Sequence, residues 1–165
     1  MSFLVISVVC GTVLSCEVCE IVHRNAYAKL GDAARVTIAP YTNIQDRAVL
    51  TTSTPTDELD GEINIGHYVT IGHGAVLDSC TVENNALIGI QAVIGPGARV
   101  GAYSQVAAGS YVEPNTQIPS GQLWAGNPAV FKRELSEDEK GSSKTQAKSY
   151  ANLAQEHFEA LETSS

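Results

Sequence analysis

The stretch that decides the fold is VLDSCTVENNALIGIQAVIGPGARVGAYSQVAAGSYVEPNTQI, residues 76–118. Within it an aliphatic side chain returns at every sixth position. These positions are Val76, Val82, Ile88, Ile94, Val100, Val106, Val112 and Ile118. Four places after each of the first seven stands a small side chain: Cys80, Ala86, Ala92, Ala98, Ser104, Ser110 and Thr116. Neither the helical period of 3.6 nor the strand period of 2 gives this pattern. A six-residue period predicts a parallel β-helix, whose coils have three short flat faces.

The same period continues upstream of residue 76 with two interruptions. The further positions are Ile38, Ile44, Leu50, Ile65 and Ile71. The first interruption is the polar stretch TTSTPTDELDGEIN, residues 51–64, which we interpret as a loop. The second is the step from Ile71 to Val76, which is one residue short. We expect the aliphatic residues to point into the prism, while each coil hydrogen-bonds to the coils above and below it.

The glycines of this region also follow the six-residue period. Gly89, Gly95 and Gly101 each occupy the position after an aliphatic residue, where the coil turns. A phosphate-binding loop would need a strand before it and a helix after it, and this context is missing. We therefore interpret these glycines as turn positions.

Length and charge narrow the classes of function. The chain has 165 residues, about one domain, with 10 basic and 18 acidic residues and a net charge of −8. Such a charge argues against nucleic-acid binding, which depends on neutralising phosphates. The four cysteines do not form a disulfide framework in a chain of this length, and Cys16-x-x-Cys19 lacks the second pair of a zinc site. We expect reduced thiols.

The two ends of the chain differ from the repeat. Residues 3–9, FLVISVV, are rich in β-branched types and are interpreted as a buried strand rather than a secretion signal, because no basic residue precedes them. Ser136 and Glu139 fit a capping box that begins a helix. We divide the chain into a β-helix (1–122), a connecting segment (123–135) and a helical segment (136–165) that packs on the β-helix or a neighbouring subunit.

Four strings carry a resemblance to a known family. They are TNIQDRAVL (42–50), IGHYVTIGHGAVLDSCTVENNALIG (65–89), IPSGQLWAGNPAVFKRELSEDE (118–139) and KSYANLAQEHFEAL (148–161). The first three resemble the γ-class carbonic anhydrases. The fourth is similar to the form of that family built into mitochondrial respiratory complex I. The resemblance implies an all-β, left-handed parallel β-helix with a C-terminal α-helix, assembled as a trimer.

The resemblance also implies a metal site between subunits, with two histidines from one chain and a third from its neighbour. Of these three positions only His73 keeps its histidine, and the other two are Thr51 and Asp78. Catalytic zinc ordinarily keeps three protein ligands and lowers the pKa of its bound water to about 7. A neutral hydroxyl is a poor zinc ligand. A carboxylate can bind zinc, but its negative charge partly cancels the charge of the metal ion and should raise the pKa of the bound water. We therefore expect no catalytic residues and no cofactor from this chain alone.

Further family positions are carried over in the same way. The arginine that pairs across the family's subunit interface is Leu30 here, whereas Asp32, Asn43, Gln45 and Asp46 match positions near the site. We expect these four to hold trimer contacts. The amphipathic segment that complex I members place ahead of the first coil is missing, so we do not expect this chain to anchor in the membrane. Tyr150 also matches the family, although its place in an amphipathic stripe favours packing.

Three hypotheses follow from the resemblance. The first is a structural subunit of the matrix-facing trimer of complex I, peripheral to the mitochondrial inner membrane. Its partners would be paralogous γ-carbonic anhydrase-like subunits and membrane-arm subunits, with no nucleic acid. Such a mixed trimer could still hold one complete zinc site if His73 is presented to a neighbouring paralogue that contributes the other two ligands. The second is an active zinc γ-carbonic anhydrase, in which Asp78 would have to ligate zinc and an outside residue would have to replace the missing histidine. The third and weakest is a hexapeptide acyltransferase that would use His73 as its catalytic base.

Overall fold

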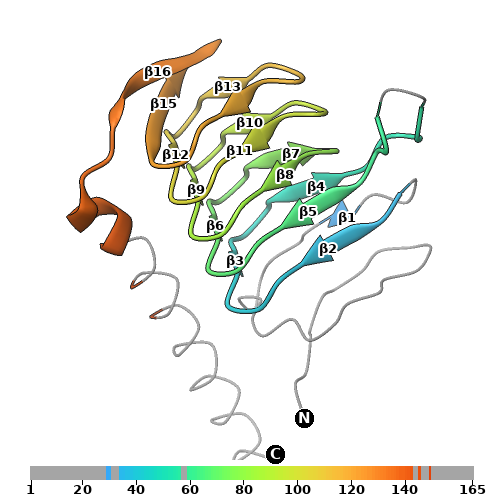
Figure 1. The fold of residues 1–165 in the computed structure, drawn as a ribbon. Coiled ribbons are helices and arrows are strands. Elements are labelled where there is room, and N and C mark those ends of the chain that lie inside the picture. The colour runs from blue at the N-terminus through green and yellow to red at the C-terminus, as the bar shows by residue number, and fades with distance from the viewer. Residues whose placement is uncertain (1–28, 31–33, 57–58, 143–144, 146–148, 150–165) are drawn as a thin grey trace, which may run out of the picture.

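The chain winds into a three-sided prism of stacked coils (Figure 1). The computed structural model describes residues 29–30, 34–56, 59–142, 145 and 149. Its strands are β1 (Lys29–Leu30), β2 (Val36–Ile38), β3 (Asn43–Ile44), β4 (Val49–Thr51), β5 (Ile63–Ile65), β6 (Thr70–Ile71), β7 (Val76–Asp78), β8 (Thr81–Val82), β9 (Leu87–Ile88), β10 (Val93–Ile94), β11 (Arg99–Val100), β12 (Gln105–Val106), β13 (Tyr111–Val112), β14 (Gln117–Ile118), β15 (Gln122–Gly126) and β16 (Ala129–Glu134). The predicted parallel β-helix is confirmed.

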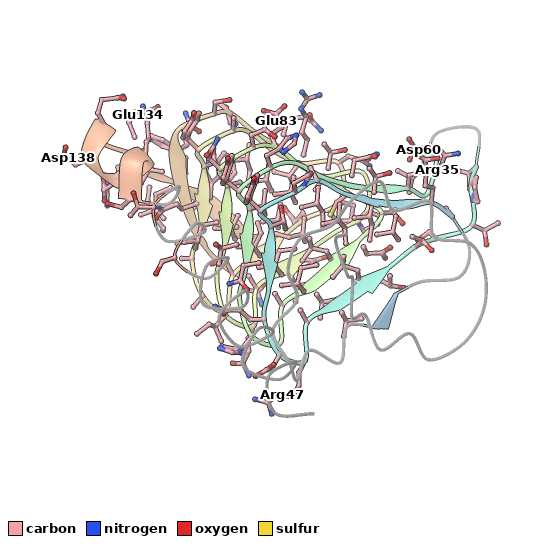
Figure 2. All side chains as sticks on the ribbon, turned by 90° about the horizontal axis from the view of Figure 1, so that it is seen from below. Arg35, Arg47, Asp60, Glu83, Glu134 and Asp138 are labelled. Carbon is pink, nitrogen blue, oxygen red and sulfur yellow. The ribbon has the colours of Figure 1, made fainter. Side chains whose placement is uncertain are left out.

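The strands form three sheets, one for each side of the prism. Sheet A has the order β1-β4-β7-β10-β13, sheet B the order β14-β11-β8-β5-β2, and sheet C the order β16-β15-β12-β9-β6-β3. We call the turns that lead from one sheet to the next corner AB, corner BC and corner CA. Figure 2 shows one residue from each corner well apart: Asp60 from AB, Glu83 from BC and Arg47 from CA. Because the coils are stacked, residues at one corner of a coil lie next to residues at the same corner of the coils above and below.

The core is the aliphatic ladder inside the prism. Seven of its eight predicted members in residues 76–118 are buried, and so are six of the seven small residues beside them. The exception in the ladder is Val76, which is half-buried on the outer face, because Leu77 fills the interior instead. Leu77 pairs with Leu50 below and with Ile94 above. The prediction for Val76 is therefore wrong: the shortened step follows Leu77.

Glycine is required at the predicted turn positions because the stacked coils leave no room for a side chain. A Cβ atom on Gly101 would lie 2.6 Å from the backbone nitrogen of Ser120 on the next coil, closer than real Cβ atoms come. The same crowding by the following coil occurs at Gly89 and Gly95. The backbone of these residues is not in the left-handed region, so close approach of the next coil excludes a side chain there.

The prism ends in a hairpin and a short helix. Within residues 123–135, the segment expected to connect, β15 and β16 pair antiparallel and extend sheet C. Residues 137–142 are helical, and the capping box is confirmed: the Ser136 N–H donates to Glu139 Oε2 and the Glu139 N–H donates to Ser136 Oγ. The strand predicted for residues 3–9 and residues 150–165 of the predicted helical segment fall outside the described residues. In the described part of the chain, no helix is long and apolar enough to cross a bilayer.

Candidate functional site

The three family ligand positions lie at two different corners of the prism. His73 lies at corner CA, in the turn between β6 and β7, whereas Thr51 and Asp78 end β4 and β7 at corner AB. Thr51 and Asp78 pair in register on neighbouring coils. His73 precedes β7 by three residues, and β7 itself, from Val76 to Asp78, spans about 6.6 Å at a rise of ~3.3 Å per residue. The structure therefore brings Thr51 and Asp78 together and places His73 apart from them.

His73 is held through its backbone by the coil below. Its N–H donates to Gln45 Oε1 at 3.2 Å, and the N–H of Gly74 donates to the Asp46 carbonyl at 2.9 Å. The imidazole itself is 45% exposed, and its Nδ1 lies 3.9 Å from Asp46 Oδ2. The other carboxylate oxygen of Asp46, Oδ1, is buried without a hydrogen-bond partner in the described chain. Corner CA thus fixes the position of an imidazole that faces outward.

Asp78 is engaged in a hydrogen-bond network at corner AB. Its Oδ1 accepts from Ser53 Oγ at 3.1 Å and from Ser79 Oγ at 2.8 Å. Ser79 Oγ in turn accepts from the Ser53 N–H at 2.8 Å, and the Ser79 N–H donates to the Thr51 carbonyl at 3.1 Å. We call Ser53, Asp78 and Ser79 the carboxylate clamp. It ties the segment after β4 to the end of β7.

The donors at corner AB do not fit a catalytic zinc ion. One oxygen of Asp78 already accepts two hydroxyl hydrogen bonds, and Thr51 offers only a neutral hydroxyl. Cys80 lies close by, but burial, reinforced by the negative charge of Asp78, raises the pKa of its thiol to about 12. It is thus not a thiolate ligand at neutral pH. Nowhere in the described residues do three or more His, Cys, Asp or Glu side chains gather as a metal site.

The remaining family positions are only partly described. Asn43 is 1% exposed, so it is buried within the chain itself, beside Thr70 on the neighbouring strand. In the described structure neither the amide of Asn43 nor the hydroxyl of Thr70 has a hydrogen-bond partner. Such unpaired buried groups are rare and costly. Asp32 and Tyr150 lie outside the described residues.

Comparison with known proteins places the fold in a family. The family model "Bacterial transferase hexapeptide (six repeats)" matches residues 79–114. The crystal structure of a hexapeptide transferase family protein from Anaplasma phagocytophilum is 35% identical, with a TM-score of 0.72, over 79% of this chain and 74% of that one. A putative acetyltransferase from Bacillus cereus, 24% identical with a TM-score of 0.63 over 85% of this chain and 91% of that one, shares the fold. The chain belongs to the hexapeptide-repeat family.

A shorter segment of the chain matches a plant protein at higher identity. Gamma carbonic anhydrase 2, mitochondrial, of Arabidopsis thaliana is 52% identical over 48 residues, which are 29% of this chain. The chain matches 17% of the length of that plant protein. This part of the chain is similar to a mitochondrial γ-carbonic anhydrase, in agreement with the resemblance seen in its sequence.

Proposed function

We propose that this chain is a structural subunit of a trimer of γ-carbonic anhydrase-like β-helices, without carbonic anhydrase activity of its own. The observation that carries the proposal is the hydrogen bonding of the Asp78 carboxylate. At a position where the family places a zinc ligand, its carboxylate is bound by two serine hydroxyls, and Thr51 is its neighbour. These hydrogen bonds join two neighbouring coils of the same chain and occupy one carboxylate oxygen of Asp78.

In this proposal the trimer is part of respiratory complex I, on the matrix side of the mitochondrial inner membrane. Its other subunits are paralogous γ-carbonic anhydrase-like chains. Two observations support this part of the proposal. The plant relative carries "mitochondrial" in its name. The tail KSYANLAQEHFEAL (148–161) is similar to the complex I form of the family.

Native separation of mitochondrial membrane complexes from the source cells tests this placement. The chain is expected to migrate with NADH:ubiquinone oxidoreductase activity, and mass spectrometry of that band should find paralogous β-helix subunits beside it. If the chain migrates only apart from that activity, the placement in complex I is wrong.

A second candidate function is a zinc site completed by a paralogous subunit. The observation that favours it is His73, whose side chain is half exposed while Gln45 holds its backbone. A neighbour that supplies two further imidazoles would complete a three-ligand site. Zinc analysis of the purified assembly tests this idea. Zinc that is lost in the His73→Ala variant would support it, and an assembly free of zinc would exclude it.

The acyltransferase hypothesis gains no support from the position of its candidate base, although the family model and several similar structures carry transferase names. A shallow groove of about 320 Å³ lies on sheet B beside corner BC, lined by Thr37, Asn64, Ile65, Gly66, Thr81, Val82, Glu83, Asn84 and Ala102. It contains no histidine. His73, the base that the sequence suggests, lies at corner CA, on the opposite edge of sheet C, whereas His67 lies beside the groove and its N–H donates to Asn84 Oδ1. The groove and the base are therefore not combined in one site.

A further inference from the structure

Three tyrosines stand in one row at corner BC. Tyr41, Tyr68 and Tyr103 occupy the same position in three turns of this corner, because backbone hydrogen bonds stack the turns on one another. The rings of Tyr41 and Tyr68 are stacked, with their centroids 4.9 Å apart and an interplanar angle of 5°. The side chains of Tyr41 and Tyr103 are 39% and 38% exposed. We call these three residues the tyrosine row.

The backbone of the tyrosine row is in the left-handed region, with φ angles of 62°, 57° and 60°. Bulky side chains rarely adopt this conformation, which favours glycine and asparagine. At corners AB and CA the described turn residues with positive φ are not aromatic: Arg47, Gly61, Gly74, Ser79, Gln91, Gly97, Gly109 and Asn115. Backbone strain of this kind clusters at ligand-binding sites, so its confinement to one corner points to a function there.

The corner around the tyrosine row is polar and has no unpaired charge. With histidine neutral, Glu83 is the only charged residue in its turns, 39–42, 66–69, 83–86, 101–104 and 119–121. Arg99 pairs with Glu83, which Figure 2 labels at this corner. The groove on sheet B adjoins the corner, and Asn84 Oδ1 accepts from the His67 N–H there, which leaves the Asn84 amide hydrogens available. Charge complementarity therefore calls for an uncharged partner that offers hydrogen-bond acceptors.

The spacing of the rings selects the backbone of that partner. Tyr68 and Tyr103 are two coils apart, and Asn85 on the coil between them is only 6% exposed. Two coil spacings amount to about 9.6 Å. A polyproline II helix returns to the same face every three residues, about 9.3 Å along its axis. The two-residue repeat of a strand, about 6.6 Å, and two turns of an α-helix, about 10.8 Å, match less closely.

We propose that the tyrosine row and the adjoining groove bind a proline-rich segment of another protein in the polyproline II conformation. One proline ring packs on Tyr103, and a second, three residues away, packs on the stacked pair of Tyr41 and Tyr68. The backbone of this helix has no internal hydrogen bonds, so its carbonyls can accept from the amide of Asn84. Proline-rich segments dock on aromatic-lined surfaces in this way. The site lies away from corners AB and CA, so it is separate from the family's ligand positions.

Fluorescence polarisation of labelled decaproline with the full chain tests the proposal. Wild type should bind decaproline saturably, and a glycine-serine peptide of the same length should not bind. Tyr103→Asn removes an exposed ring but keeps a residue that tolerates positive φ, and it should weaken binding about tenfold, as expected for the loss of one interface aromatic. Tyr111→Thr on β13 of sheet A removes a tyrosine at a distance from corner BC and should bind like wild type.

Circular dichroism of each variant shows whether the fold is kept. For Tyr103→Asn this is expected, because Asn85 and Asn115 already adopt the same backbone conformation in other turns. A wild type without saturable binding at millimolar decaproline would overturn the proposal. A glycine-serine peptide that binds equally well, or a Tyr103→Asn variant that binds like wild type, would also overturn it. These results are independent of zinc content and of migration with complex I, so this site and the proposed function can fail separately.

Discussion

Replacing Asp78 by alanine removes the acceptor at the centre of the carboxylate clamp. Ser79 is 2% exposed, so its hydroxyl would lose its acceptor in a place that water does not reach. Ser53 is half-buried and its hydroxyl can turn to solvent. The loss is therefore close to one hydrogen bond to a charged group, about 2 kcal/mol. For a chain of this size that lowers the melting temperature by about 4–8 °C.

Thermal unfolding followed by circular dichroism measures this loss. Asp78→Asn is the matched control, because its side-chain oxygen still accepts from both serine hydroxyls, and it should cost less than about 1 kcal/mol. Each protein is melted with and without EDTA, and the melting temperature of wild type should not change with the chelator.

The opposite response to EDTA and to Asp78→Asn would refute the role of the carboxylate clamp. If Asp78 were a zinc ligand, EDTA would destabilise wild type, and Asp78→Asn would be as damaging as Asp78→Ala because an amide is a poor replacement for a ligating carboxylate.

Three further predictions concern the packing and titration of the prism. Leu77→Ala should cost about 2–5 kcal/mol in urea unfolding, whereas Val76→Ala on the outer face should cost about 1 kcal/mol or less; equal costs would contradict the assigned register. A hydrogen bond from Arg99 lowers the pKa of Glu83, so Glu83 stabilises the fold above its ordinary pKa of 4.5, and this contribution is lost as the pH falls below that value. The melting temperatures of wild type and Glu83→Gln should accordingly converge in acid, and a gap that stays constant would contradict this. Cys80, whose pKa is about 12, should resist iodoacetamide at pH 8 until the protein unfolds, as peptide mapping can follow; rapid labelling of the folded chain would show that it is accessible.

The buried ladder could be predicted from spacing alone, because only a coil of three six-residue faces returns every sixth side chain to the interior. The position of the short step could not. Val76 and Leu77 are adjacent and both aliphatic, so the sequence pattern is satisfied by either of them. The choice is made by pairing with Leu50 and Ile94 on the neighbouring coils, which is a contact between distant parts of the chain.

The candidate site was predictable only in part for a similar reason. The resemblance identified His73, Thr51 and Asp78 as the ligand positions, but not the carboxylate clamp. Ser53 belongs to a polar insertion without a period and is 25 residues from Asp78 in sequence, so no local pattern links them. The pairing of β4 with β7 brings them together.

The central claim is that this chain keeps the family's prism without a metal site that it can complete by itself. Elemental analysis of the purified chain, loaded with zinc and then dialysed against metal-free buffer, tests this most directly. The account predicts that zinc is lost on dialysis and that the chain does not accelerate CO2 hydration. Stoichiometric zinc retained at Thr51, His73 and Asp78, with zinc-dependent CO2 hydration, would contradict it.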